Sequence, residues 1–173
     1  MKRILTLSLA AVLLVSALTG CSGGGGQESQ AVMTPEEYTA AYQAAIEGAR
    51  DAEMNEAVPV ITSADDDMAA LILPMLGITE ENAAAFAVAV SPMNIRAYGI
   101  AAVLPADGTS EEVQAGLQGF IDQQKQSFEQ YLADQYEIAN AARLETLDDG
   151  TILLVMCEDQ DTVFDAIQDA LSA

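Results

Sequence analysis

The sequence predicts an α+β domain over residues 34–173, with an antiparallel sheet of about four strands and helices packed on one face of the sheet. Two observations lead to this prediction. Apolar side chains alternate along short runs that come in pairs, which is the period of a β-strand. Segments with helical spacing lie before, between and after these pairs, in the order α-α-β-β-α-β-β-α, and this arrangement is typical of an α+β domain.

The N-terminal part of the domain is predicted to be helical. Thr34 can cap a helix, and Glu37 can complete a capping box with it. Apolar side chains then recur at helical spacing, so we expect one helix that starts after Thr34 and ends between residues 49 and 56. A second, shorter helix is expected over about residues 68–73, because a proline and a glycine follow it.

Two strands follow and are predicted to pair as an antiparallel hairpin. Phe86, Val88 and Val90 alternate with alanines in the run "AFAVAVSP". The run "YGIAAVLP" begins at Tyr98 and alternates in the same way. Residues 93–97 would form a rather long loop between the two strands.

A long helix, a second hairpin and a last helix are expected in the remaining residues. The apolar face of the long helix extends over about residues 110–132. Asp148-Asp149-Gly150 is a strong turn signal between the runs "ARLETL" and "TILLVMC". Since residues 152–157 are all apolar, we expect the second run to be a central strand. The last helix should begin at Asp159 or Asp161.

The first twenty residues have the pattern of a secretory signal peptide. Lys2 and Arg3 form a basic start, and residues 4–18 are almost entirely apolar. This run is shorter than the roughly 20 residues that a membrane-spanning helix needs. The stretch Leu18-Thr19-Gly20-Cys21 resembles the lipobox of bacterial lipoproteins. The resemblance implies that residues 1–20 are removed and that Cys21 carries a diacylglyceryl group, whereas the alternative is an ordinary signal peptide with a chance cysteine.

A lipid on Cys21 would anchor the protein to the outer face of the bacterial cytoplasmic membrane. Two acyl chains hold a protein stably, whereas one chain holds it only marginally. Residues 21–33 would then comprise the lipidated cysteine and a Gly/Ser-rich tether, which we expect to behave as a flexible coil. The folded domain would begin at residue 34.

The charge of the chain limits its partners. Removal of Lys2 and Arg3 leaves four of the six basic residues against 27 acidic ones, a formal charge of −23. Nucleic acid is therefore excluded as a direct partner, because its binding depends on neutralising phosphates. The membrane should be contacted through the lipid only, since anionic headgroups repel the domain. A cationic protein or peptide would be attracted, although an aid to solubility is the better explanation of the charge.

Several catalytic classes are excluded by composition. The chain has no histidine, which removes Ser-His-Asp and Cys-His catalysis and histidine metal sites. It has no phosphate-binding or dinucleotide-binding motif, so we expect no cofactor and no metal. With Cys21 lipidated, Cys157 has no disulfide partner, and its apolar surroundings predict a buried, inert thiol. Paired carboxylates remain as hydrolytic machinery, but among 27 acidic residues some pair will face each other by chance.

Residues 71–173 resemble a family of small lipoproteins from clostridial Firmicutes that carry a C-terminal domain of unknown function. The resemblance is carried by Pro92-Met93-Asn94 before a strand, by the phrase from Phe128 to Tyr136, and by the glycine-bearing hairpin before the last strand. It implies a Gram-positive surface location and no known activity. The family commonly has an acidic pair where this chain has Tyr98-Gly99.

One candidate binding surface lies in the loop between the first two strands. Met93, Asn94 and Arg96 are expected there, at one end of the sheet. Arg96 is one of few basic side chains in a very acidic chain, so it either pairs with a carboxylate or helps to line a small recognition surface.

The function expected from these features is that of a lipid-anchored, extracytoplasmic binding or accessory module, non-catalytic and of unknown ligand. One alternative is a carboxylate-dependent hydrolase of the cell envelope or of glycans, which requires two facing, partly buried carboxyl groups in a cleft. Another is an inhibitor or assembly partner in an envelope complex. The sequence leaves the oligomeric state open.

Overall fold

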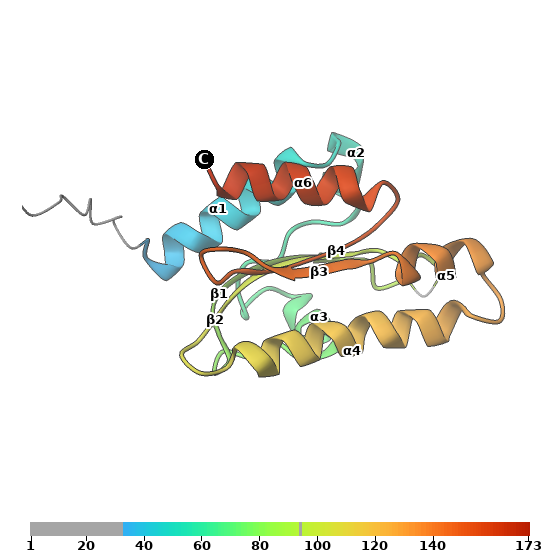
Figure 1. Cartoon of the computed structure of the whole chain (residues 1–173), viewed down its shortest axis with the longest axis horizontal. Coiled ribbons are helices and arrows are strands. Elements are labelled where there is room, and N and C mark those ends of the chain that lie inside the picture. Colours follow the sequence, from blue (N-terminus) through green and yellow to red (C-terminus); the bar gives the residue numbers. More distant parts are fainter. Residues whose placement is uncertain (1–32, 94) are drawn as a thin grey trace, which may run out of the picture. The chain divides into compact units, whose positions relative to one another are not determined.

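The computed structural model describes residues 33–93 and 95–173, which form a four-stranded antiparallel sheet and six helices (Figure 1). The predicted signal peptide, Cys21, residues 22–32 of the predicted tether and Asn94 lie outside the described residues. The α+β class, the antiparallel sheet and the predicted order of helical and strand segments are confirmed. In chain order the strands are β1 (Ala83–Val90), β2 (Gly99–Pro105), β3 (Arg143–Thr146) and β4 (Ile152–Met156).

The spatial order of the strands is β1-β2-β4-β3. Both predicted hairpins are present, since β1 pairs with β2 and β3 pairs with β4. The two hairpins join through β2 and β4, where Gly99 lies opposite Met156 and Val103 opposite Ile152. β4 is therefore a central strand, as its uninterrupted apolar sequence predicts, and all of its residues are buried.

Helices cover both faces of the sheet, so the prediction that they pack on one face is wrong. One face packs against α3 (Ala69–Leu76), α4 (Ser110–Phe128) and α5 (Ala133–Asn140). The opposite face packs against α1 (Pro35–Gly48) and α6 (Gln160–Leu171), which Figure 1 shows side by side. The alanines that alternate with Phe86 and Val88 in β1 are buried beneath α1, because a small side chain lets the helix approach the sheet closely.

Two helices end earlier than their apolar patterns predict. α1 stops at Gly48, and a separate helix, α2 (Ala52–Ala57), begins after Asp51, whose carboxylate accepts a hydrogen bond from the Met54 amide at 2.7 Å. The helix expected to reach residue 132 ends at Phe128 and is followed by α5, which was not predicted. The first break places Arg50 in the short connection between α1 and α2.

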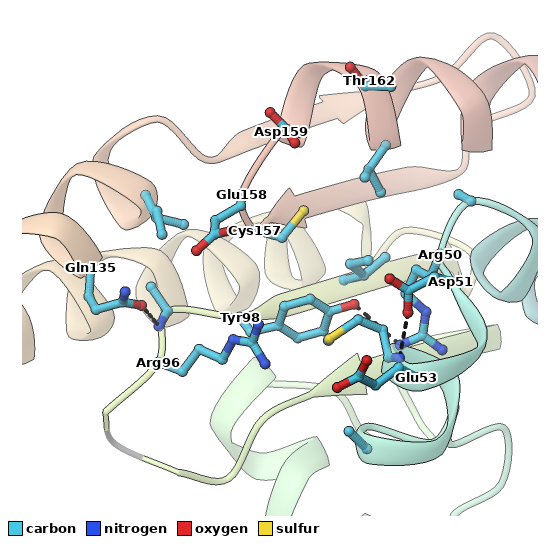
Figure 2. A pocket seen from close by; sticks show the side chains of 17 residues that line it. Arg50, Asp51, Glu53, Arg96, Tyr98, Gln135, Cys157, Glu158, Asp159 and Thr162 are labelled. Atoms are coloured by element: carbon cyan, nitrogen blue, oxygen red, sulfur yellow. Dashed lines mark hydrogen bonds between the residues drawn. The ribbon is translucent and has the colours of Figure 1, made fainter.

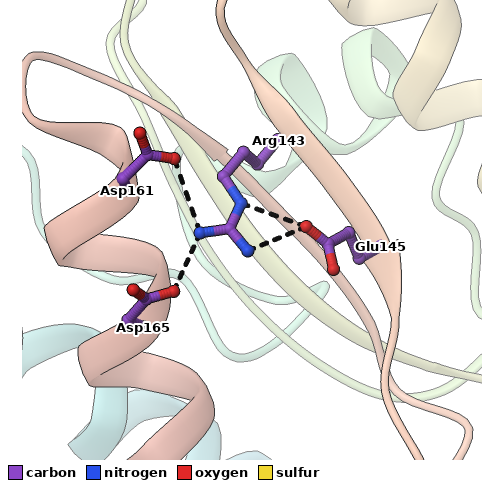
Figure 3. Close-up of polar contacts among 4 residues, drawn as sticks. All are labelled: Arg143, Glu145, Asp161 and Asp165. Carbon is purple, nitrogen blue, oxygen red and sulfur yellow. Dashed lines mark hydrogen bonds and ion pairs between the residues drawn. The ribbon is translucent and has the colours of Figure 1, made fainter.

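The edge strand β3 is tied to α6 by one arginine (Figure 3). The Arg143 guanidinium donates to Glu145 Oε1 at 2.8 and 3.0 Å and to Asp165 Oδ1 at 2.8 Å, and it lies 3.5 Å from Asp161 Oδ1. Its carbon lies 3.7 Å from the centre of the Phe164 ring. One cation thus holds together three carboxylates from two elements, which would otherwise repel one another.

α3 and α4 cross at two glycines. Gly77 ends α3 in the left-handed conformation, with φ of 67°, as is usual for a residue after a helix. A Cβ atom on Gly116 would lie 2.6 Å from the Leu76 carbonyl oxygen and 3.0 Å from the Gly77 Cα atom. The two helix backbones therefore approach each other more closely than a side chain at position 116 would allow.

Candidate functional site

A cavity of about 510 Å³ lies at the end of the sheet where β2 begins and β4 ends. Its walls come from the connection between α1 and α2, the residues just before β2, part of α5, and the turn that leads from β4 into α6 (Figure 2). A volume of this size is typical of small-molecule sites. The polar and charged side chains that line it include Arg50, Arg96, Tyr98, Gln135, Cys157 and Glu158.

Arg50 forms one wall of the cavity and is only partly satisfied. Its Nη1 atom donates to the Val58 carbonyl oxygen at 2.9 Å and to the Tyr98 hydroxyl at 3.3 Å. Its Nε and Nη2 atoms are buried and have no hydrogen-bond partner within the described part of the chain. These two nitrogens form the edge of a guanidinium that binds a carboxylate through two parallel hydrogen bonds. Buried donors of this kind are costly to leave unpaired, and both atoms are closed off from solvent, so an acceptor in the cavity reaches them only after a shift of the Arg50 side chain.

Tyr98 lies between the two arginines of the cavity, with its hydroxyl toward Arg50 (Figure 2). The Arg96 guanidinium carbon is 5.9 Å from the centre of the Tyr98 ring. Tyr98 is 6% exposed, and this burial raises the pKa of its hydroxyl, although the hydrogen bond from Arg50 acts in the opposite direction. The hydroxyl therefore keeps its proton at neutral pH and can donate it to an acceptor in the cavity.

The segment that carries Arg96 is held by α5. The Ala97 amide donates to Gln135 Oε1 at 2.8 Å, which fixes the backbone beside Arg96. No carboxylate of residues 33–93 and 95–173 lies within 4.0 Å of the Arg96 guanidinium, so the predicted ion pair is not formed among them. Arg96 instead lines the cavity, and its role in recognition stays a prediction.

Of the other two predicted site residues, Met93 does not join the cavity wall and Asn94 is not described. Met93 is 57% exposed and is not among the lining residues. Asn94 lies outside the described residues. Of the two candidates that the structure describes, Arg96 lines the cavity and Met93 does not.

The wall formed by the β4–α6 turn is acidic and contains the buried thiol. Cys157 is 5% exposed, as predicted, and burial, with the nearby charges of Asp159 and Glu158, raises its pKa from 9.0 to about 11. Glu158 is exposed and lines the cavity. Asp159 has a φ of 55°, and it is the only non-glycine residue with a positive φ among those that the structure describes. Its carboxylate does not cap α6. This backbone conformation turns the chain sharply at the edge of the cavity.

Sequence reasoning missed Arg50 because the apolar pattern of α1 continues past the break that exposes it. Gly48 and the capping residue Asp51 were the available signals of that break. Gln135 was missed because α5 was not predicted at all. Tyr98 was assigned correctly to the same sheet face as Ile100 and Ala102, but its contact with Arg50 joins residues 48 positions apart and leaves no trace in spacing.

Two further findings concern the described residues. None of their helices combines the length and the apolar character that crossing a membrane would require. Their cysteine and carboxylate side chains form no group of three or more that is arranged to hold a metal ion.

The fold and the cavity define an α+β domain with a pocket of small-molecule size at one end of its sheet. Residues 61–157 match the family described as Domain of unknown function (DUF4358), and because this match covers more than half of the chain, the chain belongs to that family. The match takes in the whole sheet together with α3, α4 and α5, whereas α1, α2 and α6 lie outside it. No curated protein and no solved structure matches the chain.

Proposed function

We propose that the protein is a non-catalytic binding module, anchored by a lipid on Cys21 to the outer face of a Gram-positive cell membrane, and that its ligand occupies the cavity between Arg50 and Arg96. The observation that carries this proposal is the placement of positive charge. Only four basic residues follow Cys21, and two of them line this one cavity. Chance would not favour such a gathering in a chain with 27 acidic residues.

The unpaired edge of Arg50 supports a binding role. A buried guanidinium normally finds acceptors for its donors within the protein. Here the hydrogen bonds to Val58 and Tyr98 fix the orientation of Arg50 while Nε and Nη2 remain without acceptors among the described residues. These unpaired donors make Arg50 a candidate recognition element, available to a ligand when its side chain turns toward the cavity.

The hydrolase alternative finds less support in the cavity. A glycosidase needs two facing carboxyl groups, one of them with a raised pKa. The carboxylates that line this cavity are all exposed, and they belong to Asp51, Glu53, Glu158 and Asp159. The two facing and partly buried carboxyl groups that a hydrolase requires are not found around it.

The location of the module rests on the sequence around Cys21. The lipobox-like stretch directly follows an apolar run, and a Gly/Ser-rich tether follows the cysteine. Mass spectrometry of the protein from a Gram-positive host should show an N-terminal Cys21 that carries a diacylglyceryl group. The Cys21→Ser variant should leave the membrane fraction, and recovery of an unmodified Cys21 in the wild-type protein would overturn the location.

The binding proposal is tested by capture of small molecules. The intact protein, in detergent, is incubated with the low-molecular-weight fraction of spent culture medium and washed on a filter, and retained compounds are released by denaturation and identified by mass spectrometry. We expect compounds that the wild-type protein retains and that Arg96→Gln retains at least about tenfold less, because a charge-assisted hydrogen bond contributes roughly 1.5–3 kcal/mol. Arg96 is exposed, so this change should leave the fold intact.

The matched control is Lys125→Gln, which removes one positive charge from α4 at a position that does not line the cavity. This variant should retain the same compounds as the wild-type protein. If all three proteins retain the same compounds in equal amounts, the cavity is not a binding site. Capture of a membrane protein in place of a small molecule, equally by all three, would instead favour the role of an assembly partner.

A further inference from the structure

We propose that the ligand is a small zwitterion that carries both a carboxylate and an ammonium group, as a free amino acid or a short peptide with unblocked termini does. This inference rests on the proposed binding function of the cavity and adds the chemical class of its ligand. It follows from the distribution of charge over the cavity walls, from the field of the whole chain, and from the size of the cavity.

The carboxylate of the ligand would bind at the arginine wall. Arg50 lines this wall, and its Nε and Nη2 edge, which is closed off from solvent here, would match the two oxygens of a carboxylate once the side chain turns toward the cavity. The Tyr98 hydroxyl adds a neutral donor, since it accepts from Arg50 and keeps a proton of its own. Arg96, which stands over the Tyr98 ring, is long and exposed and can reach the same group.

The ammonium group of the ligand would bind at the acidic wall. Glu158 and Asp159 come from the turn between β4 and α6, whereas Arg50 and Arg96 come from other elements (Figure 2). Asp51 and Glu53 also line the cavity, and they lie beside Arg50. Within the described residues neither Glu158 nor Asp159 forms an ion pair with a protein cation, because the ion pairs found there all belong to Arg143. Two free carboxylates beside a cavity suit an ammonium group.

The field of the whole chain disfavours a purely anionic ligand. With a formal charge of −21, the protein repels an anion such as phosphate at long range, and this repulsion slows its entry. A zwitterion has no net charge to be repelled and can still place its carboxylate against the arginines. The same cavity therefore selects for ligands in which a positive group accompanies the negative one.

The size of the cavity agrees with this class. About 510 Å³ is enough for a molecule larger than a single inorganic ion, and the cavity is also lined by apolar atoms of Met54, Ile100, Ile138 and Val163. These side chains offer contacts for the carbon skeleton between the two charged ends.

The test uses an equimolar dipeptide library with free termini, the same library amidated at the C-terminus, the same library acetylated at the N-terminus, and inorganic phosphate. Retention of each probe by the intact protein in detergent is measured by mass spectrometry and phosphate analysis. We expect members of the free library to bind, and either blocking group to weaken their binding by about tenfold or more.

Variants at two exposed residues test the two charged ends of the ligand separately and should leave the fold intact. Arg96→Gln should reduce the difference between free and amidated peptides, and Glu158→Gln should reduce the difference between free and acetylated peptides. Lys125→Gln should behave as the wild-type protein does. Equal binding of free and blocked peptides, or binding of phosphate without peptides, would overturn the zwitterion while leaving a functional cavity. If the protein also captures no compound from spent medium in an Arg96-dependent way, the proposed function itself fails.

Discussion

Cys157 shows how position in the sheet controls the chemistry of a single side chain. The residue follows β4 directly and packs in the core formed with α1 and α6. Burial disfavours the thiolate, and the adjacent charges of Asp159 and Glu158 disfavour it further, so the pKa of the thiol rises to about 11. Although it borders the cavity, the thiol is therefore expected to remain protonated and unreactive at neutral pH.

This raised pKa predicts how stability depends on alkaline pH. In the unfolded chain the thiol loses its proton near pH 9, whereas in the folded protein it keeps the proton until about pH 11. Its contribution to stability is fully present below pH 9 and is lost as the pH rises toward 11. After an allowance for solvent screening, the loss should be roughly 1–2 kcal/mol in the free energy of unfolding, measured with urea at pH 8 and pH 10.5.

The control for this prediction is Cys157→Ala, which should lose less stability over the same pH interval. All other ionisable groups are common to both proteins, so the difference between the two slopes isolates the thiol. If the two slopes are equal, or if Cys157 reacts with a thiol reagent in the folded protein as fast as in urea, the thiol is not buried as described.

At the scale of elements, close approach of backbones matters more than helix propensity in one part of α4. Gly116 and Gly119 occupy the same helix, and replacing either by alanine should raise intrinsic helix propensity by about 1 kcal/mol. Only Gly116 lies against α3, where a Cβ atom would be 2.6 Å from a backbone oxygen. A Cβ atom on Gly119 would have no other atom within 4 Å.

We therefore expect opposite signs for the two substitutions. Gly116→Ala should destabilise the protein by roughly 1–3 kcal/mol, because α3 must move away from α4. Gly119→Ala should stabilise it by about 0.5–1 kcal/mol. Urea denaturation of both variants measures the difference, and a stabilising Gly116→Ala would show that the two helices do not pack as described.

The sequence was a good guide to elements whose pattern is local. The strands, their hairpins and the central place of β4 follow from alternation and from turn residues such as Asp148 to Gly150. The second helical layer, formed by α1 and α6, could not be predicted in the same way. The alanines of β1 gave no sign of a second buried face, although they are buried beneath α1. Of the cavity, Arg96 was predicted, whereas Arg50 and Gln135 depend on helix breaks with weak or no signals. The segment from Phe128 to Ala133 contains no glycine or proline to mark the end of α4.

At the scale of the whole molecule, the excess of acidic residues opposes folding. A formal charge of −21 brings like charges together in the compact state and favours expansion. Arg143 relieves this repulsion at one place, where it binds three carboxylates, but it is one of few basic residues. Most of the surface must rely on water and on ions from the solution.

Added salt should consequently stabilise the protein. Raising NaCl from 10 to 200 mM shortens the screening length from about 30 Å to less than 10 Å, so repulsion between distant carboxylates weakens. We expect the midpoint of thermal unfolding, Tm, to rise by about 3–6 °C, measured by circular dichroism. Sucrose at the same osmolality should raise Tm less, and a Tm that falls with NaCl would show that favourable ion pairs outweigh repulsion.

The pairing of α1 with α6 on one sheet face has a consequence for biogenesis. Tyr42 of α1 and Phe164 of α6 belong to the same buried cluster, although they stand near opposite ends of the domain sequence. Until α6 emerges from the ribosome, Tyr42 and its neighbours lack the part of their cover that α6 supplies. A nascent chain halted before α6 would expose apolar side chains of this cluster. Chaperones and proteases bind such surfaces, so unfinished copies can be recognised and degraded.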